Sequence, residues 1–149
     1  MLKGRVVVIT GGAGLIGQEF VKTVAKNDGI AIIADIDRAQ AEVAKEKLRS
    51  ILKCNCIDSV ELDITSTKSI DEVISYVDQK YGRIDALVNN AYPRNKNYGK
   101  HFFDVKYNDF VENVGMNLGG YFITSQIFSK YFQNQGHGNI INISSIYGV

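Results

Sequence analysis

The sequence predicts an α/β fold in which a doubly wound parallel sheet carries helices on both faces. Apolar runs of strand length alternate with amphipathic stretches of helix length along all 149 residues, a pattern typical of right-handed βαβ units. The apolar runs show little polar alternation, which favours strands buried on both faces. The third observation is a glycine-rich turn at 10–17, between the first apolar run and the first amphipathic stretch.

The first half of the chain predicts three strands and three helices. Strands are expected at 5–9, at 30–34 and, shorter and nearer the sheet edge, at 59–62. Apolar residues at helical spacing predict helices over 18–26 and 37–52. A third helix is expected to begin at a cap on Thr67 or Ser69, and to run to about Tyr81 before Gly82 ends it.

The second half predicts two more strands and one long helix. Strands are expected at 84–88 and 139–143, and a helix at 110–132 with a break near Gly119 and Gly120. We expect the strand order 3-2-1-4-5. The irregular span 91–99 follows the fourth strand, at the sheet edge where doubly wound sheets bind their ligands.

Composition limits the classes of function. The length suits about one domain, and a net charge of +1 gives no sign of a nucleic-acid partner. No apolar run approaches the ~18 residues of a membrane span. The N-terminus leads straight into a strand and leaves no room for a signal peptide, so we expect a cytoplasmic protein.

Cysteine and histidine residues predict no special chemistry. Cys54 and Cys56 stand too close in sequence for an easy disulfide, and we expect two reduced thiols. His101 and His137 have no partners at metal-ligand spacing, so we predict no metal site.

The glycine-rich turn predicts a site for a phosphate group. Glycine lets the backbone turn sharply and lets an anion approach closely, while the new helix presents free amides and its positive dipole end. Mononucleotide-binding and purely structural turns share this layout, and both stay open as alternatives. The candidate residues at this turn are Gly11, Gly14, Leu15, Ile16 and Gly17.

Asp35 ends the second predicted strand and suits a nucleotide ribose. A carboxylate there can accept both ribose hydroxyls and would repel a 2′-phosphate, which favours NAD over NADP. Asp35 could instead share a helix N-cap with Asp37. Nearby Arg38 keeps NADP open as the less favoured cofactor.

Further polar residues follow the third and fourth strands at the same edge. Asp63 and Ile64 come after the third strand, and Asn90 and Ala91 come after the fourth. Asp63 could equally be a turn residue before Thr65, and serial asparagines can tie neighbouring loops through their amides.

These motifs, in their order and spacing, resemble the short-chain dehydrogenase/reductase family over the whole chain. The resemblance rests on the segment 10–17, Asp35, Asp63-Ile64, Asn89-Asn90-Ala91, Asn117 and the segment 142–145. It implies a Rossmann-type sheet, a nicotinamide cofactor and hydride transfer at a carbonyl or carbinol carbon. It also implies a homo-oligomer, a dimer or tetramer formed through the long helix.

The resemblance implies a role for each matching residue. Asp35 would bind the ribose, Asp63 and Ile64 the adenine, and Asn90 and Ala91 would line the cofactor. Asn117 would hold a water for proton relay, and Ser145 would hydrogen-bond the substrate oxygen. Without the family, a Ser-Ser pair after a strand is more often a turn or cap.

The sequence departs from the family pattern in three ways. Gly14 stands one residue before the usual middle glycine, a spacing that resembles the epimerase-like branch acting on nucleotide sugars. Tyr92 and Pro93 replace the glycine that usually follows Asn-Asn-Ala. The family's Tyr-x-x-x-Lys motif should follow the serine, but Tyr147 is too close to it and has no lysine after it.

We therefore expect this chain to be the N-terminal, cofactor-binding part of a longer protein, with the later strands absent. The alternative is an NAD-binding module without turnover or an inactive truncation. A tyrosine with a lysine four residues on, encoded shortly after this segment, would favour the enzyme.

The loop after the fourth strand predicts contact with an anionic substrate, such as a sugar acid. Residues 92–100 carry three cations and two tyrosines, and Tyr92 and Arg94 are the candidate contacts. A solvated loop is the alternative. This loop and the segment 142–149 also resemble a subgroup linked to flagellin modification and nonulosonic sugars.

Overall fold

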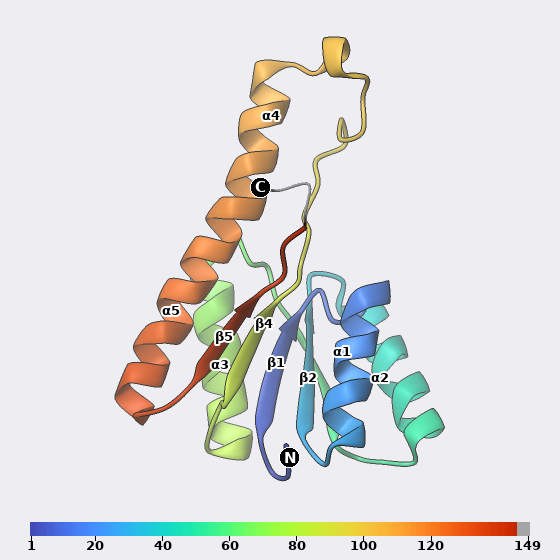
Figure 1. The fold of residues 1–149 in the computed structure, drawn as a ribbon, viewed down its shortest axis with the longest axis vertical. Coiled ribbons are helices and arrows are strands. Elements are labelled where there is room, and N and C mark those ends of the chain that lie inside the picture. Colours follow the sequence, from blue (N-terminus) through green and yellow to red (C-terminus); the bar gives the residue numbers. More distant parts are fainter. Residues whose placement is uncertain (146–149) are drawn as a thin grey trace.

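The computed structural model describes residues 1–145, in which one parallel sheet has the order β3-β2-β1-β4-β5 (Figure 1). This is the predicted order. Every pairing is parallel, and Ile9 of β1 lies level with Ile33 of β2 and Val88 of β4. The carboxyl ends of the central strands therefore meet at one edge. The strands are β1 (Val6–Thr10), β2 (Ile30–Asp35), β3 (Ile57–Glu61), β4 (Ala86–Asn89) and β5 (Asn139–Asn142).

Helices cover both faces of the sheet, as predicted (Figure 1). Alternate residues of β1 separate into two cores: Val7 and Ile9 pack with α1 and α2, whereas Val6 and Val8 pack with α3 and α5. Burial on both faces explains why the strands lack polar alternation. The helices are α1 (Leu15–Lys26), α2 (Arg38–Leu52), α3 (Thr67–Tyr81) and α5 (Gly120–Gln135).

Two helix starts show how short polar side chains set the element boundaries. Asp37 caps α2, because its carboxylate accepts from the Gln40 amide at 2.9 Å. Ser66 caps α3 through the Ser69 amide, so the expected cap at Thr67 or Ser69 was one to three residues late. Gly82 ends α3 in the left-handed conformation, as predicted.

The long helix continues where a break was expected. A short 3-10 helix η1 (Phe102–Asp104) leads to α4 (Tyr107–Val114), and a wide π-helical turn η2 (Gly115–Gly119) joins α4 to α5. Gly119 and Gly120 keep helical backbone angles. Gly120 serves a close approach instead, since a Cβ there would lie 2.7 Å from the Ile64 Cδ1.

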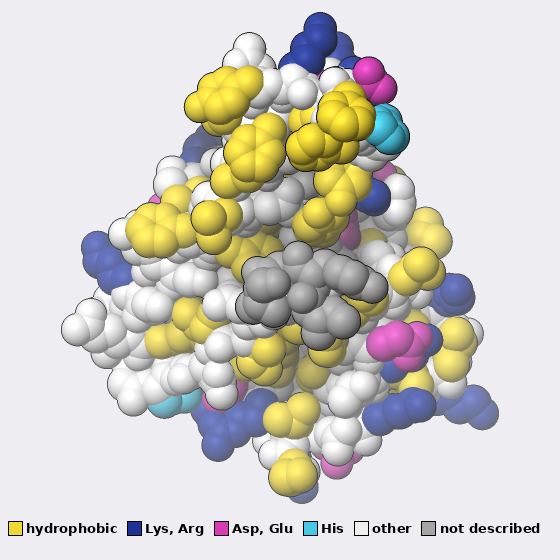
Figure 2. All heavy atoms as spheres, turned by 45° about the horizontal axis from the view of Figure 1, so that its top comes forward, with side chains coloured by type: hydrophobic (Ala, Val, Ile, Leu, Met, Phe, Trp, Pro, Cys, Tyr) yellow, Lys and Arg dark blue, Asp and Glu magenta, His cyan; other side chains and the backbone are white. Residues whose placement is uncertain are grey.

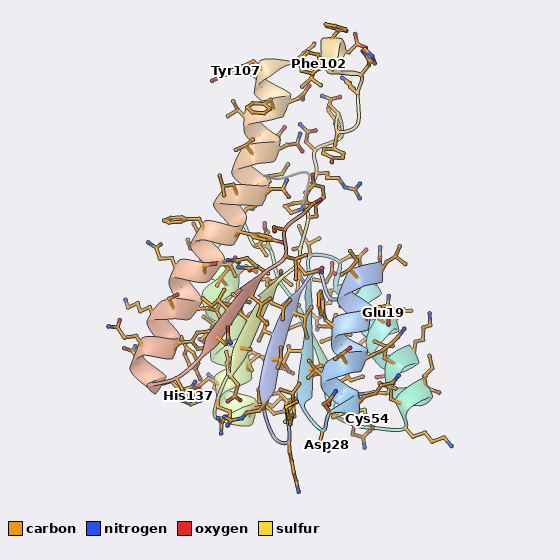
Figure 3. All side chains as sticks on the ribbon, viewed as in Figure 1. Glu19, Asp28, Cys54, Phe102, Tyr107 and His137 are labelled. Carbon is orange, nitrogen blue, oxygen red and sulfur yellow. A yellow bond between two sulfur atoms is a disulfide. The ribbon has the colours of Figure 1, made fainter. Side chains whose placement is uncertain are left out.

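The expectation of two reduced thiols was wrong. Cys54 and Cys56 form a disulfide between the end of α2 and the start of β3, with their Cα atoms 5.4 Å apart; Cys54 is labelled in Figure 3. That separation lies within the roughly 4.4–6.8 Å that disulfides span. Lys53 ends α2 in a left-handed conformation and turns the chain before β3. The spacing of the two cysteines, only two residues apart, predicted no bond, but the backbone between them gives a Cα separation that a disulfide can span.

Apolar side chains are exposed at the end of the molecule where α4 rises above the sheet (Figure 2). Phe102 and Tyr107 mark this end in Figure 3, and Phe102 is 81% exposed. Across residues 1–145, no helix combines the length and the apolar character that crossing a bilayer requires.

Candidate functional site

A pocket of about 570 Å³ opens at the carboxyl edge of the sheet. All the residues that the sequence predicted as cofactor ligands line it, although they come from four separate segments of the chain. Tyr92 and Arg94, the predicted substrate contacts, line it as well. The ten predicted cofactor residues in its wall are Gly11, Gly14, Leu15, Ile16, Gly17, Asp35, Asp63, Ile64, Asn90 and Ala91.

The glycine-rich turn places the first turn of α1, which has no side-chain cap, beside this pocket. Gly14 occupies the N-cap without a side chain, and the first turn of α1 contains no acidic residue. The first amides of a helix have no acceptor within the helix, so they are available to an anion. Gly11 has a φ of +62°, and a Cβ on Gly17 would lie 2.2 Å from the Gly11 carbonyl oxygen. Side chains at these two positions would disrupt the turn.

Asp35 connects two segments of the pocket wall. One carboxylate oxygen accepts from the Ala13 amide at 3.1 Å, and the other accepts from the Asp37 amide at 3.2 Å. Asp37, rather than Asp35, is the helix cap. The half-buried Asp35 carboxylate is therefore held in a defined position beside the glycine-rich turn.

Thr10 supports the pocket and was not among the predicted site residues. Its buried hydroxyl accepts from the amides of Asn90 and Ala91, each at 3.0 Å. The Asn90 side chain in turn donates to the carbonyl oxygens of Thr10 and Gly11. This reciprocal pairing locks the end of β4 to the end of β1. The sequence feature that could have pointed to Thr10 is its position as a hydroxyl-bearing residue at the end of a buried strand.

Asn89 ties β4 to its other neighbours. Its Nδ2 donates to Asn142 Oδ1 at 2.8 Å and to Ser125 Oγ at 3.0 Å. The Asn89 side chain thus ties β4 to β5 and α5, whereas the Asn90 side chain ties the end of β4 to the glycine-rich turn.

Asp63 is a turn residue, as one interpretation of the sequence expected. Its Oδ1 accepts from the amide and the hydroxyl of Thr65, which makes it a turn residue, and the residue also lines the pocket. Four other lining residues were not predicted. Ile36, Leu62 and Pro93 each adjoin a predicted residue, and Gln40 lies in the first turn of α2.

The two predicted catalytic residues lie outside the pocket wall. Asn117 is in the wide turn η2, where its Nδ2 donates to the carbonyl oxygens of Pro93 and Asn113, both at 2.9 Å. Its buried Oδ1 accepts no hydrogen bond from the described part of the chain. Ser145 is exposed and follows β5. Tyr147 lies outside the described residues.

Tyr92, Arg94 and Tyr98 form a group on the loop after β4. The two tyrosine hydroxyls are 2.8 Å apart, and their rings meet edge to face. This hydrogen bond is the main cause that raises the pKa of Tyr92. The Arg94 guanidinium carbon lies 5.4 Å from the centre of the Tyr98 ring and 5.9 Å from that of Tyr92.

The family model of the short chain dehydrogenases matches residues 5–149. The chain belongs to the short chain dehydrogenase family. This membership accounts for the parallel sheet and for the pocket at its carboxyl edge.

Individual members of the short chain dehydrogenase family are similar over nearly the whole chain. The post-translational flagellin modification protein A of Campylobacter coli is 39% identical over 150 residues, which cover 100% of this chain and 58% of that protein. The chain thus spans a little over half the length of this relative.

Two crystal structures of similar fold support the same membership. A short chain dehydrogenase from Bacillus anthracis has a TM-score of 0.88 at 31% identity, covering 99% of this chain and 57% of that chain. An NAD⁺-bound xylitol dehydrogenase has a TM-score of 0.87 at 26% identity, covering 99% and 55%.

Proposed function

We propose that the full-length protein is an NAD-dependent oxidoreductase that transfers hydride between the cofactor and a carbinol or carbonyl carbon of a small molecule. The observation that carries this proposal is the single pocket in which the glycine-rich turn, Asp35 and Asn90 meet. Short chain dehydrogenases use nicotinamide cofactors, and the similar xylitol dehydrogenase was solved with NAD⁺ bound.

The residues present fit such a cofactor. The start of α1 offers free amides and no acidic side chain to a pyrophosphate. The Asp35 carboxylate is half-buried beside that turn and can accept ribose hydroxyls. When bound, the nicotinamide supplies the carbon that gives or takes the hydride. Asp63 and Ile64 would contact the adenine, while Asn90 and Ala91 would line the rest of the cofactor.

Ser145 and Asn117 are the proposed catalytic contributors from this chain. The Ser145 hydroxyl would donate a hydrogen bond to the substrate oxygen, which stabilises negative charge there as hydride arrives. Asn117 would hold a relay water, and its unpartnered buried Oδ1 supports this role. The acid/base would be a tyrosine with a lysine four residues on, both following Ser145 in the full-length protein.

A sugar-derived substrate, used in flagellin or surface-glycan modification, is the finer part of the proposal. It rests on the similarity to the Campylobacter coli protein. We also propose that the full-length protein forms a dimer or tetramer through α4 and α5. Exposed apolar side chains recur every fourth residue along this long helix, at Phe110, Val114, Leu118 and Phe122, and could pack against a second copy. Light scattering of the full-length protein measures its oligomeric state.

The decisive test combines cofactor binding with turnover. Calorimetric titration of the full-length protein with NAD should detect binding, and a panel of polyols and sugar derivatives should yield NADH with at least one member. Ser145→Ala should keep NAD affinity and lose turnover by about 100-fold or more. NAD binding without turnover of any alcohol or carbonyl would favour the binding module instead.

A further inference from the structure

The loop after β4 sorts its side chains onto two faces. From Tyr92 to Tyr98, even-numbered residues are exposed and odd-numbered residues are half-buried. The loop has no regular secondary structure at 92–95 and then makes a turn at 96–99, in which the Tyr98 backbone amide donates to the Asn95 carbonyl oxygen at 3.2 Å. One face of the loop therefore packs on the protein, and the other presents Tyr92, Arg94, Lys96 and Tyr98.

The inner face is fastened to α4 and η2. Asn95 and Asn97 both donate from Nδ2 to Asp109 Oδ1, at 3.1 and 2.8 Å. The Asn95 amide donates to Asn113 Oδ1, and Asn117 donates to the Pro93 carbonyl. These hydrogen bonds span 12 to 24 residues of sequence, and they hold the outer face in a defined place.

Arg94 lies on that outer face with its charge uncompensated. Its guanidinium packs near the rings of Tyr92 and Tyr98, but within residues 1–145 no carboxylate pairs with it. Ring contacts restrict the side chain without using its five N–H donors. A restrained guanidinium with unused donors suits an oxyanion, which can accept two parallel hydrogen bonds.

Its location points to the substrate rather than to the cofactor phosphates. Arg94 lines the pocket beyond Ala91, on the loop that leaves the end of β4. The start of α1 already offers a pyrophosphate free amides and its positive dipole end, and Arg94 lies three residues beyond Ala91, which contacts the glycine-rich turn. A second cationic contact at the loop therefore serves a different anion.

We propose that Arg94, restrained by Tyr92 and Tyr98, binds a terminal oxyanion of the substrate, a phosphate or carboxylate carried by a sugar-sized molecule. This rests on the proposed function for the neighbouring cofactor site. Tyr92 and Tyr98 act as positioning residues, and Arg94 makes the contact.

Binding of simple probes tests the proposal without knowledge of the natural substrate. The full-length protein, saturated with NAD, is titrated with glucose 6-phosphate, glucuronate and neutral glucose. We expect at least one anionic probe to bind about tenfold or more tightly than glucose. Arg94→Gln should remove this preference and leave the NAD affinity unchanged. Lys96→Gln removes an equal charge from the same outer face, outside the pocket wall, and should preserve the preference.

The outcomes separate the two proposals. If the wild-type protein binds NAD but shows no preference for the anionic probes, the role of Arg94 is overturned. Equal loss of that preference in Arg94→Gln and Lys96→Gln overturns it as well. So does weaker NAD binding by Arg94→Gln alone. Repeating the titrations without NAD tests for failure of the proposed function. If the protein never binds NAD but still binds the anion through Arg94, only the proposed function is contradicted. The stronger of the two anionic probes identifies phosphate or carboxylate as the group.

Discussion

The Asp35 carboxylate accepts a hydrogen bond from the Ala13 amide at 3.1 Å, across 22 residues of sequence. The end of β2 is thereby joined to the glycine-rich turn. One carboxylate thus helps to shape the turn that would receive the pyrophosphate and faces the pocket where the ribose would lie. Loss of Asp35 should therefore affect cofactor choice and turn geometry together.

Asp35→Ala should weaken NAD binding about tenfold or more, because charge-assisted hydrogen bonds to ribose hydroxyls are lost. Discrimination against NADP should fall as well, since no carboxylate would repel the 2′-phosphate. Titration of wild type and variant with both cofactors measures these effects. Asp37→Asn is the matched control, since the amide retains an oxygen that can cap α2. Tighter binding of NADP than of NAD by the wild type would contradict the choice of cofactor.

Thr10→Val should destabilise the protein by about 2 kcal/mol, because the amides of Asn90 and Ala91 would lose their shared acceptor. Valine keeps the shape of threonine, so packing changes little. Urea denaturation measures the free energy of unfolding. Thr10→Ser retains the hydroxyl and should lose clearly less; equal losses in both variants would assign the effect to packing.

Asp58 should contribute to a loss of folding stability at acidic pH. Burial alone would raise the pKa of this carboxyl, but hydrogen bonds from Lys80, Tyr76 and Tyr81 outweigh it and lower the pKa below its ordinary value. A lowered folded pKa contributes stability above the unfolded value, and that contribution is lost as pH falls through the folded value.

We therefore expect the unfolding free energy of the wild type to decrease at pH values below about 4. The decrease should be smaller in Asp58→Asn. Denaturation at several pH values between 7 and 2 checks this. Asp71→Asn removes an exposed carboxylate from α3 and should leave the acid fall as in the wild type. Tyr76 and Lys80 have Tyr-x-x-x-Lys spacing, but both donate to the Asp58 carboxylate, and neither lines the pocket at the sheet edge.

The Cys54–Cys56 disulfide should stabilise the protein only slightly. It closes a very short loop, for which chain entropy predicts about 1–2 kcal/mol. Denaturation with and without reductant measures the difference, and peptide mapping under non-reducing conditions detects the bond. The double variant Cys54→Ser, Cys56→Ser should be insensitive to reductant. Two free thiols in the unreduced protein would contradict the structure.

The sequence by itself determined the succession of strands and helices and the segments that contribute to the pocket. These depend on neighbours close in the chain: strand burial follows from apolar runs, the end of α3 from Gly82, and the bare start of α1 from Gly14. Asp35, Asp63 and Asn90 could be assigned to one edge because parallel strands end together there.

Only the tertiary structure decided how those segments hold one another. Thr10 and Asn90 are 80 residues apart, and their pairing requires β1 and β4 to be neighbours. Gly120 was expected to break the long helix, but in the structure it permits close packing against Ile64. The local backbone geometry, with Cα atoms 5.4 Å apart, permits the Cys54–Cys56 bond. The position of Arg94 on the outer face of the loop depends on the hydrogen bonds by which Asn95 and Asn97 attach the loop to Asp109. Such contacts depend on the arrangement of elements in space, which local residue patterns do not encode.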